Sequence, residues 1–437
     1  MVVTIVVLLI LAGVTISLLL DENGIIKKSK DARREYGQAK ANEQEDLSNL
    51  SDMIDEATAE PTPKVNVNTK AGDNSTINGK KGNANNPTIP AGYIPINTET
   101  SNWGNGKDAP SQDSVKHGLV IKDEQNNEWV WVPVPDVTVM CDTLNNTEYT
   151  LCGTTGETAV KTKLYSKSGI ISGKTRTTPG TSSGYREPDL VAGSGSSYDA
   201  KDTYYKTILG DTGTKEQLAE LFADEYKAMI ESVSKYGGFY IGRYELSGTV
   251  TEPTEKTGKT LTKTDWYNLY NACRSSKLQA SDKVKTQMIW GCQWDVTMNW
   301  LISSGAKTSD EVNKDSSTWG NYKNYNTANN YTEGTAGYEK NAGSLQNTGS
   351  SENWKANNIY DLAGNCYEWT QEANDTNLRA VRGGSCINYG SYSPASYRSF
   401  NNPDNSGYGS VRFSSHFNNK VTLDSRAWAP VWRIIIK

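Results

Sequence analysis

The chain opens with an apolar run, Val2–Leu20, in which no residue is charged. A run of this length is enough to cross a bilayer as a single helix. A signal peptide would carry a basic start and a small-residue cleavage site, and a core helix would carry polar positions at helical spacing. The pattern therefore predicts a single-pass membrane helix, with the C-terminal part of the chain outside the cell.

A charged segment follows, in which Leu47, Leu50 and Ile54 recur at helical spacing. A hydrophobic helix that runs directly into an amphipathic one, here over residues 1–58, resembles the N-terminal helix of type IV pilin-like proteins. The resemblance implies display on a pilus and contacts with other pilin-like subunits. Pilins carry a processing site ahead of this run, so we expect either a start upstream of Met1 or a plain anchor.

Residues 59–87 hold Pro61, Pro63 and many Asn, Thr, Gly and Lys residues but few apolar ones, which predicts a flexible linker. From Thr88 the pattern becomes globular, and we predict one domain over residues 88–437. Inside it, residues 139–213 show little periodicity and predict a loop-rich insertion.

Aromatic and β-branched residues follow a turn signal at Asn126-Asn127, so Glu128–Pro133 is predicted to be a strand that pairs with Gly118–Ile121. Short strands and a few helices lie among long polar loops, and this order predicts an α+β fold with high loop content. The other predicted elements are helices over 217–234, 264–275 and 288–301, a strand over 237–245 and a loop region over 309–353.

Composition narrows the function classes. The net charge of −5 comes from interspersed acidic and basic residues, so nothing indicates a nucleic-acid partner. With only two histidines, His117 and His416, neither a histidine-rich zinc site nor a Ser-His-Asp triad is expected. The 12 Trp and 24 Tyr against 5 Phe favour surfaces that bind as well as pack.

The six cysteines include no C-x-x-C pair, which argues against zinc-ribbon and thioredoxin sites. Cys141 and Cys152 bracket a short polar segment and could close a disulfide loop in an oxidising compartment. For Cys273, Cys292 and Cys366 a free, buried thiol is at least as good an interpretation.

Two motifs close together define the scaffold: Leu362-Ala-Gly-Asn-Cys-Tyr-Glu-Trp369 and Arg382-Gly-Gly-Ser385. With the strand Gly238–Glu245, they resemble the formylglycine-generating enzyme (sulfatase-modifying factor) family. The resemblance covers residues 88–437 and implies a C-type-lectin-like fold. Family members carry an acidic pattern where this chain has Gln293-Trp-Asp295, so a metal contact from that helix is in doubt.

Enzymes of this family hold copper with two cysteines shortly after the R-G-G-S motif, because Cu(I) prefers thiolate ligands. Here only Cys386 follows that motif. We therefore expect no copper and, on balance, no enzyme activity. A hydrolase built on Asp361, Glu368 and Glu372 is a further alternative.

The resemblance also implies a structural Ca²⁺ whose oxygen ligands come from the G-N-x-x-E-W segment, here Asn365 and Glu368. A buried, hydrogen-bonded Asn and Glu would give the same pattern, so both interpretations stay open.

The segment after Ser385 alternates Tyr, Ser, Asn and Gly, the composition of antibody-like binding loops. It resembles the variable region of C-type-lectin-like receptors that diversity-generating retroelements target. Arg398 interrupts this run and is predicted to anchor the loop by charge-assisted hydrogen bonds. The predicted ligand-binding residues are Asn388, Tyr389, Ser391, Tyr392, Ser393, Tyr397, Ser399, Asn401, Asn402, Asn405, Tyr408, Ser410 and Trp428.

Two segments compete as the closing strand, Val411–Phe413 and Val431–Ile436. If the second closes the fold, Ser414–Pro430 extends the binding loop and Trp428 becomes a contact residue.

The sequence thus predicts a membrane-anchored or pilus-displayed protein that binds an extracellular protein or glycan through its C-terminal loops. The alternatives are a formylglycine-generating-enzyme-type oxidoreductase and a structural filament subunit, in which the Tyr- and Asn-rich loops only coat the surface.

Overall fold

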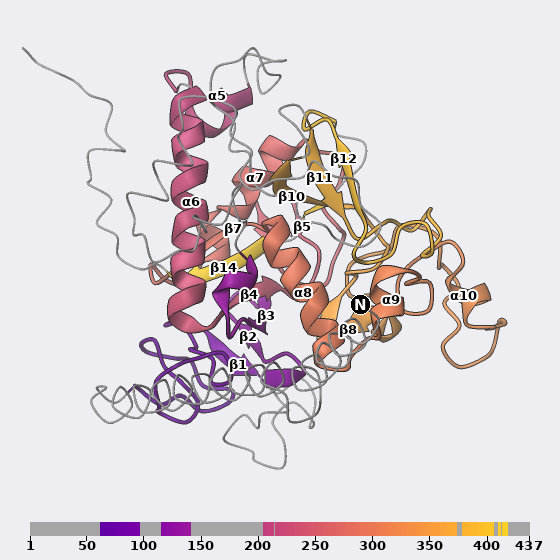
Figure 1. Cartoon of the computed structure of the whole chain (residues 1–437), viewed down its shortest axis with the longest axis horizontal. Coiled ribbons are helices and arrows are strands. Elements are labelled where there is room, and N and C mark those ends of the chain that lie inside the picture. The colour runs from indigo at the N-terminus through magenta and orange to yellow at the C-terminus, as the bar shows by residue number, and fades with distance from the viewer. Residues whose placement is uncertain are drawn as a thin grey trace, which may run out of the picture. The chain divides into compact units, whose positions relative to one another are not determined.

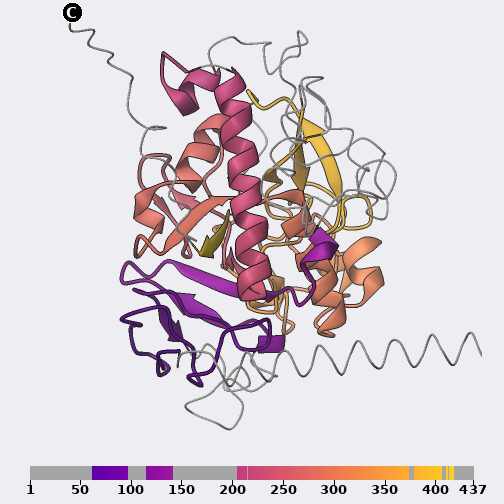
Figure 2. The same ribbon diagram turned by 60° about the vertical axis from the view of Figure 1, so that its left-hand side comes forward.

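The computed structural model describes residues 62–96, 115–140, 204–213, 215–373, 378–405, 410–411 and 413–417. All of them belong to one compact unit, Thr62–Lys437 (Figures 1 and 2). The predicted membrane and pilin-like helix lies outside these residues, as does most of the predicted insertion. None of the helices in the described part of the chain is long and apolar enough to cross a membrane.

The described residues form a mixed α and β fold with few helices and small, mostly antiparallel sheets. The helices are α5 (Tyr204–Leu209), α6 (Lys215–Tyr236), α7 (Trp266–Cys273), α8 (Gly291–Ser303), α9 (Ser309–Asn313) and α10 (Tyr325–Ala328), with 3-10 turns η2 (Val137–Met140), η4 (Ser276–Leu278) and η5 (Glu352–Trp354).

A six-stranded antiparallel sheet has the order β1-β2-β3-β4-β14-β7. The predicted hairpin is confirmed, since Val120 pairs with Val130 and Ile121 with Trp129. Its strands are β1 (Ile94–Ile96), β2 (Val120–Lys122), β3 (Glu128–Pro133), β4 (Gly238–Gly242), β7 (Val284–Met288) and β14 (Phe413–Phe417).

Of the first competing segment, Val411 lies in β13 (Ser410–Val411) and Phe413 begins β14, which inserts between β4 and β7. Which of the two segments closes the fold stays a prediction. Because residues 414–417 are committed to this sheet, they do not extend the binding loop. Trp428 and Val431–Ile436 lie outside the described residues.

A second sheet carries the scaffold motifs, in the order β12-β11-β10-β13. Gln371 connects it to the first sheet, because its backbone N–H donates to Ile289 O at 3.0 Å and its Nε2 donates to Met288 O at 2.8 Å. The strands are β10 (Glu368–Ala373), β11 (Arg379–Arg382), β12 (Arg398–Asn401) and β13 (Ser410–Val411), and two small ladders pair β5 (Ser247–Gly248) with β6 (Pro253–Thr254) and β8 (Lys355–Ala356) with β9 (Ile359–Tyr360).

The helices predicted over 217–234 and 264–275 are confirmed, and the third begins later than predicted, because Met288 ends β7 and α8 starts at Gly291. The apolar stripe of α6, including Phe222, Tyr226 and Val233, is buried as helix α6 passes β4 and β14 (Figure 1). Asp265 caps α7 by accepting from Asn268 N at 2.9 Å. The loop-rich interpretation of residues 139–213 is wrong for 204–209, which form α5.

The linker prediction is wrong for residues 62–87. Ile77 is fully buried, and this segment is fixed to the six-stranded sheet by Trp131 Nε1, which donates to Ala84 O at 3.0 Å. Tyr240 Oη donates to Thr88 O at 3.0 Å, just beyond it. Few apolar residues suffice here, because turns built on Asn and Asp side chains satisfy the backbone.

We expect Ile77→Ala to lower the free energy of unfolding by about 2–5 kcal/mol, because it leaves a cavity in a fully packed site. Chemical denaturation of the whole chain measures this value. Thr69→Ala, at an exposed position in the same segment, is the matched control and should change it by less than about 0.5 kcal/mol. Equal, small effects of both changes would restore the linker interpretation.

Candidate binding site

The first scaffold motif forms a tight double turn next to the second one. Gly364 has φ +76° and Asn365 φ +53°, the left-handed region that glycine and asparagine tolerate. A Cβ on Gly364 would lie 2.2 Å from Asn321 O, so only glycine fits. The N–H of Gly364 donates to Gly383 O at 2.8 Å, which joins the two motifs.

Asn365 is the centre of a buried hydrogen-bond network. Its Nδ2 donates to Glu245 Oε2 at 2.6 Å, and its Oδ1 accepts from Asn321 Nδ2 at 2.9 Å and from Gln346 N at 3.0 Å. Glu245 also accepts from Thr260 Oγ1 at 2.9 Å and from Cys366 N at 3.1 Å. Side chains from the segment after β4, from the loops and from the motif are thereby held in one arrangement.

This network bears on the predicted Ca²⁺ ligands. The amide oxygen of Asn365 already accepts two protein hydrogen bonds, so it does not face a cation in this arrangement. Glu368 is fully buried at the start of β10. Within the described ranges no group of three or more His, Cys, Asp and Glu residues is placed to hold a metal ion. The hydrogen-bonded interpretation of Asn365 describes the geometry, and Ca²⁺ stays a prediction.

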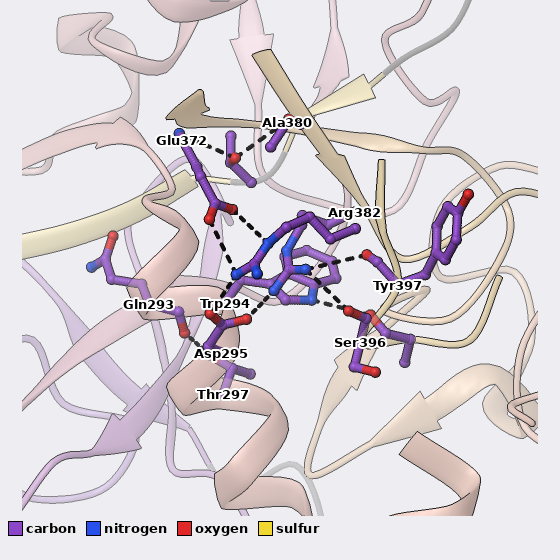
Figure 3. A network of polar contacts seen from close by, with 12 residues as sticks. Gln293, Trp294, Asp295, Thr297, Glu372, Ala380, Arg382, Ser396 and Tyr397 are labelled. Atoms are coloured by element: carbon purple, nitrogen blue, oxygen red, sulfur yellow. Dashed lines mark hydrogen bonds and ion pairs between the residues drawn. The ribbon is translucent and has the colours of Figure 1, made fainter. Parts of the chain in front are cut away.

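A second buried network fixes β11 and β12, the strands on either side of residues 383–397 in the first part of the predicted binding loop, to α8 (Figure 3). Asp295 Oδ2 lies 2.7 Å from Arg398 Nη2, and its Oδ1 pairs with Arg382 Nη2. Arg398 also contacts the fully buried Glu372, with Nε to Oε2 and Nη2 to Oε1 both at 3.1 Å. Two guanidinium groups thus meet two carboxylates, which is the condition under which buried charges are tolerated.

The predicted anchoring role of Arg398 is confirmed by these contacts. Arg382 performs the same task at the other end, since its Nη1 donates to Ser396 O at 3.0 Å and its guanidinium lies 5.9 Å from the ring centroid of Trp294. The family resemblance led us to consider a metal contact at this position. Instead, the carboxylate of Asp295 forms ion pairs with two arginine side chains.

The inner side of the loop rests on residues 316–324. Tyr322 Oη, buried beneath it, contacts both Gly383 O at 2.9 Å and Ser393 O at 2.7 Å. The N–H of Lys323 donates to Asn388 O at 3.0 Å. A Cβ on Gly390 would lie 2.3 Å from Ser317 N, so the loop backbone touches this support directly. The loop is therefore a fixed surface over residues 385–400.

The outer side of the loop exposes apolar side chains to solvent. Of the five large hydrophobic side chains that are exposed in the described part of the chain, four lie on it. They are Ile387 (68% exposed), Tyr389 (43%), Tyr392 (78%) and Phe400 (46%). The rings of Tyr389 and Tyr392 meet edge-on, with centroids 6.1 Å apart. Exposed apolar groups concentrated in this way mark interaction surfaces.

The predicted binding residues divide by exposure. Ser393 is buried under Tyr367, with the two hydroxyl oxygens 3.4 Å apart, so it supports the loop and does not face a ligand. Exposed to solvent are Tyr389, Ser391, Tyr392 and Asn402; partly buried are Asn388, Tyr397, Ser399, Asn401 and Asn405. Tyr408, Trp428 and the side chain of Ser410 lie outside the described residues, although the backbone of Ser410 pairs with Glu368.

The structure adds surface residues that the sequence interpretation missed. Ile387 and Phe400 were passed over because the loop was interpreted through its polar and Tyr content. Lys323 Nζ lies 5.6 Å from the ring centroid of Tyr389, and Leu345 is the fifth exposed hydrophobic residue. Gln346, the residue after Leu345, and Cys386, the residue before Ile387, both donate their backbone N–H to Asn365. The sequence alone could not have placed Lys323 beside this loop or the residue after Leu345 at Asn365, because their positions depend on contacts between residues far apart in the chain.

The cysteine after the second motif is not an exposed thiolate. Cys386 is buried, and burial, with the charge of Glu245, raises its pKa. Cys366 is also buried. A thiol with a raised pKa is a weak nucleophile and a weak metal ligand at neutral pH.

Comparisons with known proteins give little further constraint. No family model matches the chain, and no curated protein matches it. Among solved structures it is similar to one described as the structure of PvdO from Pseudomonas aeruginosa, at 15% identity and a TM-score of 0.26, over 41% of this chain and 81% of that one. A likeness at this level identifies neither the fold nor the function of this chain.

Asp295→Asn should lower the free energy of unfolding by about 3–5 kcal/mol, because two buried guanidinium groups lose a charged partner. Urea denaturation of the whole chain measures the change. Asp310→Asn, which removes an exposed pair with Lys314, is the matched control and should cost far less. If the two variants were equally stable, the arginine network would not be what holds the loop.

Proposed function

We propose that this chain is a membrane-anchored or pilus-displayed surface protein that binds an extracellular protein or glycan. Its binding domain has a C-type-lectin-like fold resembling the formylglycine-generating enzyme family. The observation that carries the proposal is the concentration of exposed apolar side chains on the loop after the R-G-G-S motif. The anchor rests on the apolar run Val2–Leu20.

The chemistry of the surface suits recognition. Tyr389 and Tyr392 offer large contact area with few rotatable bonds, while Ser391 and Asn402 offer adaptable hydrogen bonds. Ile387 and Phe400 add apolar area of the kind found at the centre of interfaces.

The support beneath the loop favours affinity. Ordering a loop on binding costs conformational entropy, and a loop already fixed in place avoids that cost. Asp295 holds the side chain of Arg398 through a charged contact, and Tyr322 holds the backbone at Ser393 through a hydrogen bond. The outer side chains can then vary without disturbing the fold, as diversification of the loop would require.

The enzyme alternative is weaker for a chemical reason. Copper chemistry in the resembled family needs two thiolates after the R-G-G-S motif, whereas this chain has Cys386 alone there, buried and with a raised pKa. A purely structural filament subunit is also less favoured, because coating a filament gives no reason to expose Ile387 and Tyr392.

Replacing Tyr389 and Tyr392 together by Ala should weaken ligand capture at least tenfold and leave stability nearly unchanged, since both rings are exposed. A printed glycan array and a phage-displayed library of protein domains serve as probes for the whole chain. Biolayer interferometry then measures the dissociation constant of any captured probe.

Tyr236→Ala, at the end of α6 and away from the loop, is the control and should bind like the unmodified chain. A probe that binds the double variant with unchanged affinity would contradict a binding role for this loop.

The enzyme alternative has its own measurement. We expect the whole chain to show neither stoichiometric copper binding nor oxygen consumption with a cysteine-containing peptide. Copper content by mass spectrometry and an oxygen electrode give the two values. Turnover above that of Cys386→Ser would overturn the binder proposal in favour of the oxidoreductase.

A further inference from the structure

The four cysteines in the described residues separate into two environments. Cys273 and Cys292 belong to the main hydrophobic core. Cys366 and Cys386 are buried outside that core, beside the polar network of Glu245 and Asn365. The first pair has the surroundings of small packing residues, but the second pair does not.

Cys366 and Cys386 lie next to one another, although 20 positions separate them in the sequence. The N–H of Cys386 donates to Asn365 O at 3.0 Å, and Asn365 directly precedes Cys366. One hydrogen bond and one peptide unit therefore separate the two residues, which places their Cα atoms roughly 5–7 Å apart. Disulfides join Cα atoms about 4.4–6.8 Å apart.

A shared partner gives independent support for this proximity. Glu245 Oε1 accepts from the N–H of Cys366 at 3.1 Å. The same carboxylate acts on the Cys386 thiol, whose pKa it raises in addition to the larger effect of burial. The backbone N–H of Cys366 and the thiol of Cys386 thus both lie near one carboxylate.

We infer that Cys366 and Cys386 are a disulfide pair, which forms when the domain reaches an oxidising compartment. The reaction is thiol–disulfide exchange with a small-molecule or protein disulfide. One cysteine thiolate attacks that disulfide, which forms a mixed disulfide and releases the first thiol. The second cysteine then attacks the sulfur of the first cysteine in the mixed disulfide, which forms the internal bond and releases the second thiol. The two cysteines are oxidised by two electrons, and the incoming disulfide is reduced to two thiols, which take up the two protons.

The bond would lock the base of the binding loop. It would tie the turn at Asn365 to the residue immediately before Ile387, where the exposed surface begins. Asp295 already fixes the loop through Arg382 and Arg398, so the disulfide would add a covalent third point. The compartment rests on the proposed surface location, but the pairing rests on geometry alone.

The test uses the purified whole chain equilibrated at pH 8 with reduced and oxidised glutathione, so that its outcome does not depend on where the protein resides or on what it binds. Acid-quenched, alkylated samples are digested without reduction, and peptides are identified by mass spectrometry. We expect a linked peptide pair joining Cys366 to Cys386, with Cys273 and Cys292 alkylated, and Cys141→Ser with Cys152→Ser in the same chain removes any separate link between those two. Oxidation should also raise the melting temperature by several degrees.

Cys366→Ser and Cys386→Ser each remove the linked pair and the oxidation-dependent shift in melting temperature, while Cys273→Ser keeps both. Alkylation of both cysteines at every glutathione ratio would overturn the inference. So would linkage of either cysteine to any residue other than its partner. Failure of Tyr389 and Tyr392 to bind a ligand would leave this result unaffected.

Discussion

Much of the second sheet depends on a single carboxylate. Asp295, on α8, accepts from two guanidinium groups that approach from β12 and from the end of β11. Buried guanidinium groups are costly to remove from water unless each finds a charged partner and hydrogen-bond acceptors. Arg382 and Arg398 find both here, through Asp295, Glu372 and backbone carbonyls. The two ends of a long loop are therefore held at one helix, which no apolar contact could do with equal directionality.

This anchoring divides the loop into two faces with opposite tasks. On the inner face, backbone groups of the loop form hydrogen bonds with Tyr322, Ser316 and Lys323. The hydrogen-bonding groups of a long irregular segment therefore find partners without a sheet. The outer face leaves Tyr392 and Ile387 in water, at a cost in solvation that folding alone does not require. Such a cost is reasonable where a partner covers the surface.

The scaffold motifs have a structural role in this arrangement. Gly364 and Asn365 adopt left-handed backbone conformations that bring residues 321, 346 and 383 together, and Glu245 completes the network. The amide oxygen of Asn365 accepts two hydrogen bonds from protein groups. The motif therefore works as a rigid base for the loop, whether or not Ca²⁺ also binds nearby.

The sequence by itself determined the elements whose periodicity is local. The stripe of α6, the cap of α7 and the hairpin of β2 and β3 were predictable because each depends on neighbours a few residues away. The anchoring role of Arg398 was also predictable, since a lone cation in a polar run needs a partner.

Only the tertiary structure decided the rest. Residues 62–87 look like a linker because the groups that fix them are distant in the sequence, such as Trp131, whose Nε1 donates to the backbone O of Ala84. The central place of β14 and the role of Asp295 likewise depend on pairs far apart in the chain. Local patterns carry no information about such pairs, because the free energy that fixes them comes from contacts that form only when the chain has folded.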